Sequence, residues 1–306
     1  MSEDELKKLI NFNDEYESKL ALPNELFKQI QTMVSQGKLK PTHCGFVWSY
    51  VYFMTYLFRY AKYSCYTPTT SEIKEVLGFS GTNQKLDYII KKNGLLEELN
   101  ILTTIHDFPV VVEPEDDILI FDYAGRLYGV KEWLKFNKLS LNYSCKYPVF
   151  GFHRDNDEDL DGTFYFTHNV LLLPFNVFAY CMSNKELGVN AFYFWSWLKY
   201  KNDLHSEGYC ATRSKMSSEL SLSETTIQRL INKMRSYKMI TVCHNIEYFS
   251  FGLDEEERKA NSYTVNDYEY FTYEKVSYEK IKYLTKEQHE EIKKLNGEIS
   301  VVELFS

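Results

Sequence analysis

The pattern of apolar residues in one short stretch constrains the fold of this chain more than any other feature. Over residues 224–237, apolar side chains recur at positions i, i+3, i+4 and i+7, which places them on one face of an amphipathic helix. These side chains are Ile227, Leu230, Ile231 and Met234. Residues 211–220 predict a shorter helix just before it, and residues 221–223 form a three-residue turn between the two.

Further elements flank this pair of helices. Residues 191–201 are strongly aromatic and end in charge, as a buried first helix would. Residues 239–242 predict a strand, and residues 262–265 predict its return strand. The expected order is therefore helix, short helix, tight turn, helix and a two-stranded hairpin.

Two serines compete to cap the N-terminus of the longer helix. Ser221 stands three residues before Glu224, which is the spacing of a capping box. Ser223 directly precedes the helix and is also a favoured N-cap type. The sequence leaves both arrangements open.

Positive charge is concentrated in the same segment. Residues 211–240 carry six basic and two acidic residues, a local charge of +4, in a chain whose formal net charge is −8. The basic residues are Arg213, Lys215, Arg229, Lys233, Arg235 and Lys238. Affinity for nucleic acid comes largely from cations that neutralise phosphates, so a local patch of this kind is what a helix entering a groove requires. The acidic balance excludes a protein that is basic over its whole surface.

The N-terminal half repeats this order of elements more weakly. Residues 46–60 predict an aromatic helix, residues 70–77 a short helix and residues 83–93 a third helix, and residues 117–123 predict a strand. The local charge is only +1 over residues 67–96. This copy could contact the DNA backbone weakly or serve as a dimerisation domain, and the sequence favours neither.

The two halves also align residue by residue. The aligned pairs are Leu77 with Leu220, Leu86 with Leu230, and Leu96 with Ile240, at separations of 143, 144 and 144 residues. A Leu-Pro pair, called the lead-in below, precedes each copy: Leu22-Pro23 before the first and Leu173-Pro174 before the second. One single-residue gap aligns the copies, which we interpret as a duplication. The alternative is that two such segments share an order by chance.

The C-terminal copy resembles the helix-turn-helix modules of plasmid and phage replication proteins and regulators. The residues that carry the resemblance are AFYFWSWLKY, GYCATRSKMSSELSLSETTIQRLINKMRSYKMITV and NSYTV. The resemblance implies a winged helix-turn-helix that binds double-stranded DNA, and the doubled layout resembles plasmid replication initiators with two winged-helix domains. Two residues or stretches depart from the pattern. Lys238 stands where glycine is usual before the wing, and the acidic stretch Asp254 to Glu257 would repel DNA at a wing tip.

We therefore expect a mainly α fold with small β wings, of the α+β class, with two winged-helix domains in tandem. The expected divisions are an N-terminal winged-helix domain at 1–125, a connecting segment with a hairpin at 126–170, a C-terminal winged-helix domain at 171–267, and an extension at 268–306. The extension contains one good helix candidate, residues 286–295.

The candidate DNA-contacting residues follow from the helical face opposite the apolar one. Four polar residues lie on that face: Thr225, Gln228, Arg229 and Asn232. The last three are expected to read bases, and Thr225, near the helix start, could contact a phosphate or a thymine methyl. Glutamine and asparagine can pair bidentately with adenine, and arginine with guanine. Four further cations complete the set, the first three as phosphate contacts: Arg213, Lys215, Lys233 and Arg235. The alternative is that all of these are solvated residues on the outer face of a surface helix.

The expected function is non-enzymatic, sequence-specific binding of double-stranded DNA, as a replication initiation protein or a transcriptional regulator of a plasmid or phage. A homodimer is expected, because one such helix reads only a few base pairs. The alternative is a winged-helix scaffold that binds other proteins without reading DNA. No cofactor or metal is expected.

Other features indicate a cytoplasmic protein without a membrane partner. The six cysteines are far apart and favour free thiols, and the N-terminus lacks an apolar signal core. The acidic run Asp157 to Gly162 matches half of a calcium loop, but the twelfth position is His168 rather than glutamate, which favours a hairpin turn. No glycine-rich phosphate loop is present, which argues against an ATPase.

Overall fold

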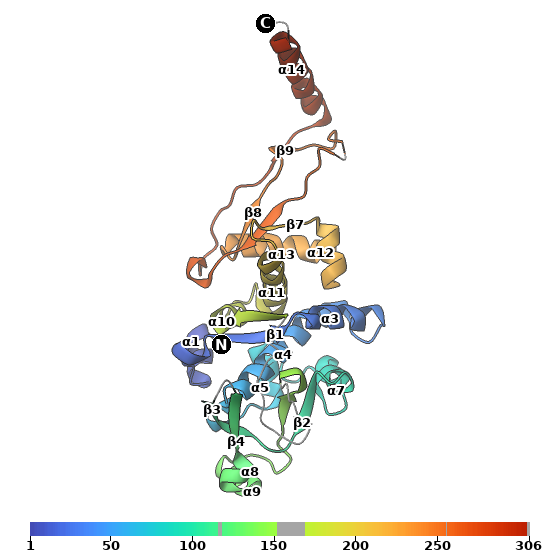
Figure 1. The fold of residues 1–306 in the computed structure, drawn as a ribbon. Coiled ribbons are helices and arrows are strands. Elements are labelled where there is room, and N and C mark those ends of the chain that lie inside the picture. The colour runs from blue at the N-terminus through green and yellow to red at the C-terminus, as the bar shows by residue number, and fades with distance from the viewer. Residues whose placement is uncertain (116–117, 152–168, 255, 305–306) are drawn as a thin grey trace.

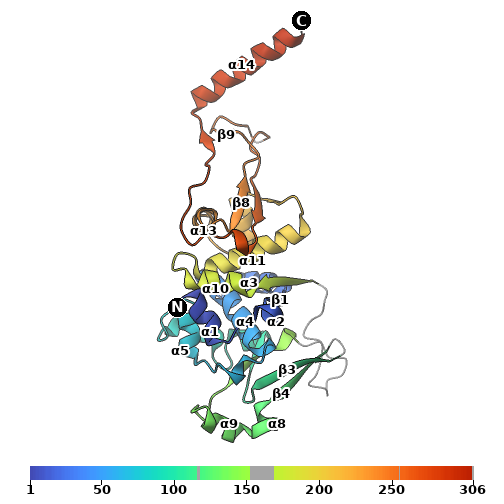
Figure 2. The same cartoon turned by 90° about the vertical axis from the view of Figure 1, so that its left-hand side faces the viewer.

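The computed structural model describes residues 1–115, 118–151, 169–254 and 256–304. Its helices alternate with small sheets, so the expected α+β class is confirmed. The N-terminal half lies at one end of an elongated molecule, the helices and strands of the C-terminal half lie in the middle, and the last helix, α14, projects at the other end (Figure 1; Figure 2).

The elements of the described residues have the following bounds. The helices are α1 (Glu3–Leu9), α2 (Asp14–Glu17), α3 (Glu25–Ser35), α4 (Cys44–Arg59), α5 (Thr70–Val76), α6 (Asp87–Ile90), α7 (Leu95–Glu98), α8 (Ala124–Tyr128), α9 (Val130–Phe136), α10 (Phe175–Ser183), α11 (Gly188–Leu204), α12 (Arg213–Leu220), α13 (Glu224–Ser236) and α14 (Lys286–Leu304). The strands are β1 (Lys19–Pro23), β2 (Leu102–Ile105), β3 (Pro109–Glu115), β4 (Ile118–Tyr123), β5 (Cys145–Pro148), β6 (Val170–Pro174), β7 (Tyr209–Cys210), β8 (Ile240–Cys243), β9 (Tyr248–Phe249), β10 (Ser262–Val265) and β11 (Lys282–Tyr283).

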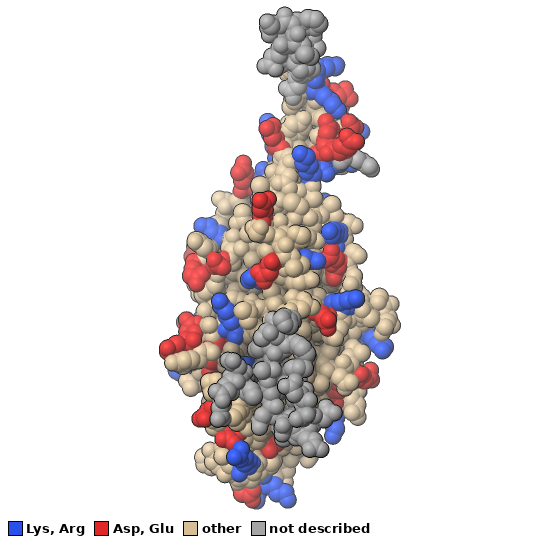
Figure 3. Space-filling view, in the orientation of Figure 1, with Lys and Arg blue, Asp and Glu red and all other residues tan. Residues whose placement is uncertain are grey.

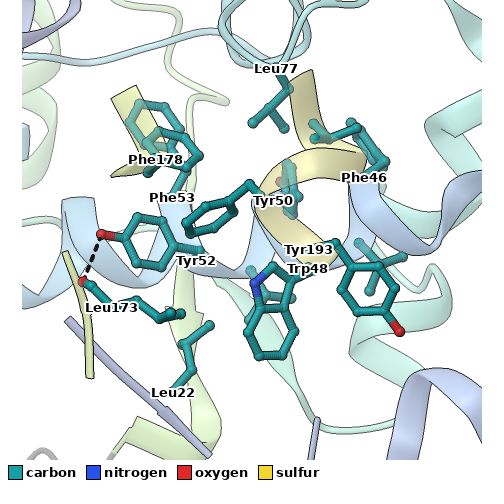
Figure 4. Close-up of a cluster of buried hydrophobic side chains, with 14 of the residues drawn as sticks. Leu22, Phe46, Trp48, Tyr50, Tyr52, Phe53, Leu77, Leu173, Phe178 and Tyr193 are labelled. Carbon is teal, nitrogen blue, oxygen red and sulfur yellow. Dashed lines mark hydrogen bonds between the residues drawn. The ribbon is translucent and has the colours of Figure 1, made fainter. Parts of the chain in front are cut away.

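The core is built around α4 and α11, the two aromatic helices that the sequence predicted. Every residue of α4 except Arg59 is buried, because apolar and aromatic side chains occupy all of its faces. Trp48 lies at the crossing of the two helices and packs against Tyr193 of α11, with ring centroids 5.9 Å apart (Figure 4). Its ring also stacks on Phe27 at 4.0 Å, and its Nε1 donates a hydrogen bond to Ser196 Oγ of α11 at 3.1 Å.

The two halves of the chain are joined in two further ways. Gly45 lets α4 approach α11 closely, since a Cβ atom there would lie 3.0 Å from the Asn190 Cα. The strands β1 and β6, which contain the two Leu-Pro lead-ins, pair antiparallel with Leu22 opposite Leu171. One cluster of buried residues spans both halves, so they share a core rather than folding around separate ones.

Part of the predicted connecting segment packs on the N-terminal half. Strand β5 pairs antiparallel with β2, and Trp133 of α9 stacks on Phe108 with ring centroids 4.7 Å apart. Residues 126–148 are therefore built into the N-terminal half. The acidic loop from Asp157, which the sequence offered as a calcium candidate, lies outside the described residues.

The N-terminal copy follows the expected order, but its third helix is broken. The expected helix at 83–93 is instead a short 3-10 turn and the single-turn α6. It ends there because Lys91 is extended and Asn93 adopts a left-handed conformation with φ 58°. The short helix expected at 70–77 is present as α5, and the strand expected at 117–123 is present as β4.

Candidate nucleic-acid interface

The interface is built by six elements in the order α11, β7, α12, α13, β8 and β10. The three strands form one antiparallel sheet in the order β7-β10-β8, with Tyr263 between Tyr209 and Val242. Asn202, near the end of α11, ties the first helix to the central strand. Its amide donates to the Tyr263 carbonyl at 2.9 Å and accepts from the Val265 N–H at 2.8 Å. The expected pair of strands is confirmed, and β7 adds a third.

The turn between α12 and α13 is fixed by backbone conformation and by a cap. Ser221 ends α12 in the left-handed region with φ 56°, a conformation that glycine adopts at least cost. Ser223 is the N-cap of α13, and its side chain accepts from the Thr226 N–H at 3.2 Å. The choice that the sequence left open is therefore settled in favour of Ser223.

We expect opposite effects from the two serines of this turn. Ser223→Ala should lower the free energy of unfolding by about 1 kcal/mol, because it removes the cap of α13. Ser221→Gly should raise it by up to about 1 kcal/mol, because glycine relieves the left-handed strain. Urea denaturation of both variants measures the difference, and equal signs for the two would contradict this assignment of the cap.

Three of the expected contact residues are joined in a hydrogen-bonded chain across the two helices. Arg213 of α12 donates through Nη1 to the Gln228 Oε1 of α13 at 2.8 Å. Gln228 in turn donates through Nε2 to the Asn232 Oδ1 at 2.9 Å. The Gln228–Asn232 pair has the i, i+4 spacing that could have been read from the sequence. The link to Arg213 could not, because it depends on how the two helices cross.

The other two candidate contact residues of α13, Arg229 and Thr225, lie on the same face of the helix. Arg229 is exposed and forms no hydrogen bond or ion pair with any residue that the structure describes. Thr225, in the first turn of α13, is exposed and its hydroxyl lies 3.0 Å from the Ser223 hydroxyl. All four side chains therefore share one surface, as the periodicity predicted. Of these four, Arg229 presents a whole guanidinium without a partner among the described residues.

The cation Lys215 lies beside this face on α12. It is exposed, and its ammonium sits 5.4 Å from the centre of the Tyr209 ring. Hydrogen bonding to Tyr209 raises the pKa of Lys215, so its positive charge is retained at neutral pH. Lys238 adopts φ 54°, a left-handed conformation that glycine adopts at least cost.

The two remaining predicted cations, Lys233 and Arg235, are already engaged within the protein. Lys233 donates to the Glu186 carbonyl oxygen at 2.6 Å. Arg235 donates to the Glu279 carbonyl oxygen and lies over the Tyr278 ring at 4.2 Å, and burial lowers its pKa. The expectation that both contact DNA is therefore not favoured by their surroundings. Their partners lie more than forty positions away along the chain, where helix periodicity carries no information.

The acidic residues Asp254 and Glu257, which lie between β9 and β10, are paired with the C-terminal extension. Lys293 of α14 lies 3.2 Å from the Asp254 carboxylate and 3.4 Å from that of Glu257. His289, buried on the same helix, accepts or donates a hydrogen bond with the Tyr248 hydroxyl at 3.0 Å. The helix expected at 286–295 is present as α14, and it neutralises charge that the sequence placed near a wing tip.

The corresponding face of the N-terminal copy is less open. The Tyr88 hydroxyl is hydrogen-bonded to the His43 ring at 3.0 Å, and Lys74 forms an ion pair with Asp87 at 2.6 Å. Lys85 and Lys92 remain exposed. This half offers scattered cations rather than a continuous polar face.

Electrostatics elsewhere on the molecule are mixed. On the face drawn in Figure 3, the side chains of Lys and Arg alternate with those of Asp and Glu. Within the described residues, no three His, Cys, Asp or Glu side chains are grouped closely enough to hold a metal ion. None of the described helices has the length and apolar character needed to cross a membrane.

The outer face of α13, with the Arg213 chain and the free Arg229, is thus the most distinctive polar surface of the described residues. It stands on a helix pair and a three-stranded sheet whose geometry is fixed by buried contacts. No protein-family model, curated protein or solved structure matches this chain.

Proposed function

We propose that residues 188–266 form a winged helix that binds double-stranded DNA with α13 in the major groove. The observation that carries the proposal is the polar face of α13, the second helix of the pair, on which Thr225, Arg229 and Asn232 are exposed and Gln228 is half-buried. A recognition helix in this position contacts base edges with the residues near its N-terminus. The local charge of +4 supports the same reading, because phosphate neutralisation dominates affinity.

The N-terminal half is proposed to be a second winged helix, related to the first by duplication. The matching order α4, α5 and α6 and the pairing of the two lead-in strands support this. Its broken third helix favours a supporting role over base reading. We further propose that the protein acts as a homodimer, as a replication initiator or a transcriptional regulator of a mobile element, because a single recognition helix reads only a few base pairs.

A salt titration tests the proposal. Three cations, Arg213, Lys215 and Arg229, are exposed at this surface, so the logarithm of affinity should fall with the logarithm of salt with a slope of about −2.7. Affinity for a mixed-sequence duplex should drop by about 40-fold between 50 and 200 mM salt. If no binding is detected at low salt, the proposed function is wrong.

A pair of lysine variants refines the interface. Lys215→Ala should weaken binding to all duplexes equally and reduce the salt slope by about one, because an exposed phosphate contact is lost. Lys233→Ala should leave the slope unchanged, because that ammonium is held by the Glu186 carbonyl. Titrating both variants beside the unaltered protein distinguishes them, and a reduced slope for Lys233→Ala would show that the lysine leaves its internal partner for DNA.

A protein-interaction scaffold is the second candidate function. The observation that favours it is exposed apolar surface on α8 and α9, where Phe136 is 86% exposed and Tyr128 is 59% exposed. Both line a groove together with Val110, Val111 and Trp133. Isolated apolar residues are ordinary on protein surfaces, but a cluster of them is typical of contact sites. The same titration decides between the candidates, since a scaffold without DNA readout would show no salt-dependent binding to duplex.

A further inference from the structure

The hydrogen-bonded chain on the outer face of α13 has a direction that chemistry alone fixes. A guanidinium can only donate, so the atom of Gln228 that faces Arg213 must be its amide oxygen. The amide nitrogen of Gln228 then faces Asn232, and the atom that it meets at 2.9 Å must be an acceptor, the Asn232 Oδ1. If the Gln228 amide were rotated by 180°, its NH2 group would face the Arg213 donor. If the Asn232 amide were rotated in the same way, its NH2 group would face the NH2 group of Gln228.

This direction decides which hydrogen-bonding groups remain for a ligand. The amide oxygens of Gln228 and Asn232 each accept one hydrogen bond from a protein donor, which leaves each oxygen one further lone pair. The other groups left for a ligand are N–H donors: the rest of the Arg213 guanidinium, the second N–H of Gln228, both N–H groups of Asn232, and all of Arg229. The surface therefore presents mainly donors outward.

Guanine suits such a surface better than adenine does. Bidentate pairing of an amide with adenine uses the amide oxygen for N6–H and the amide nitrogen for N7, on one edge of the side chain. The Asn232 oxygen already accepts from Gln228, so only one of its two lone pairs is left for the N6–H of an adenine. Guanine presents two acceptors, N7 and O6, in the major groove and matches a surface of donors.

We propose that α13 reads guanine bases, with Arg213 acting as a positioning residue that turns the amides of Gln228 and Asn232 into donors. The proposal rests on the proposed DNA binding and names its target: a major-groove edge with consecutive guanine acceptors. It revises the expectation, drawn from residue type alone, that the glutamine and asparagine would select adenine.

The first experiment identifies the bases that are read. Duplexes bound by the full chain are selected from a random pool, and the tightest is resynthesised with 7-deazaguanine or with 7-deazaadenine, in which the N7 acceptor is replaced by C–H. We expect guanine-rich selected sites and a loss of about tenfold in affinity with 7-deazaguanine, with little change for 7-deazaadenine. A larger loss with 7-deazaadenine would overturn the inference and leave DNA binding intact.

The second experiment tests the positioning role with a matched control. Arg213→Ala and Lys215→Ala each remove one exposed cation from α12, but only Arg213 holds Gln228. Arg213→Ala should reduce the selectivity for guanine over adenine by several-fold, since the freed amides can turn, whereas Lys215→Ala should weaken both duplexes and leave the ratio unchanged. An equal change of ratio in both variants would refute the positioning role. Failure of the unaltered protein to bind any duplex at low salt would instead overturn the proposed function, and the inference with it.

Discussion

Replacing Arg229 and Asn232 together by alanine is expected to lower the affinity of the protein for its selected duplex by about 100-fold. Each good base contact contributes about 1–3 kcal/mol of discrimination, so losing two costs about 3 kcal/mol or more. Both side chains are exposed on α13, so the variant should retain its fold. Competition with mixed-sequence DNA measures the affinity for the selected duplex relative to other sequences. It therefore separates the loss of specificity from the general loss of affinity that follows from removing a positive charge.

The matched control removes the same two residue types elsewhere. Arg126 and Asn142 lie exposed on the N-terminal half, and Arg126 makes only a surface ion pair with Asp122. The double variant Arg126→Ala with Asn142→Ala removes one positive charge and one amide from the protein, as the test variant does, and should leave specific binding within about threefold, because its charge lies outside the proposed interface. If the α13 variant binds its selected site as tightly as this control, α13 is not the reading helix.

Local features of the interface could be predicted because they depend on neighbouring residues. The period of Ile227 and Leu230 placed α13 correctly to within one residue of its end, and the face opposite them was identified with it. The return strand was predicted at the bounds that the structure has, residues 262–265. Periodicity and alternation hold for such elements because each side chain's direction follows from its own backbone.

Features that depend on distant contacts could not be predicted. Helix periodicity left Lys233 available to DNA, but the Glu186 carbonyl, on the segment before α11, holds its ammonium. The broken third helix of the N-terminal half followed a good helical pattern, yet the backbone around Asn93 turns left-handed and ends it. The partner of the acidic stretch, Lys293, comes from the extension, which the sequence treated as a separate segment. In each case tertiary packing overrides a local preference.

The shared core has a consequence for how binding and stability are connected. The duplication hypothesis predicts two modules, but Trp48 of the first half packs against Tyr193 of the second half and donates a hydrogen bond to Ser196 there. The proposed reading helix α13 packs on α11, which also packs against α4. A destabilising substitution in the N-terminal core should therefore disturb the candidate interface, although the two sites are far apart in the sequence.

Trp48→Ala is expected to lower the free energy of unfolding by about 3–5 kcal/mol, the cost of truncating a large aromatic side chain in a core. Trp48 is fully buried, and its removal would leave a cavity between α4 and α11 and deprive Ser196 of a partner. Trp48→Phe should cost less, because it keeps most of the ring and loses mainly the indole N–H. Urea denaturation followed by far-ultraviolet circular dichroism measures both.

Hydrogen exchange in Trp48→Ala shows whether the loss reaches the interface. Because one core spans both halves, amide protection in α11 and α13 should fall together with protection in α4, by a factor that matches the loss of global stability. Two separate folding units would behave otherwise, with α4 and α5 losing protection while α12 and α13 keep theirs. That second outcome would show that the C-terminal module folds alone and would allow it to be tested for DNA binding without the first half.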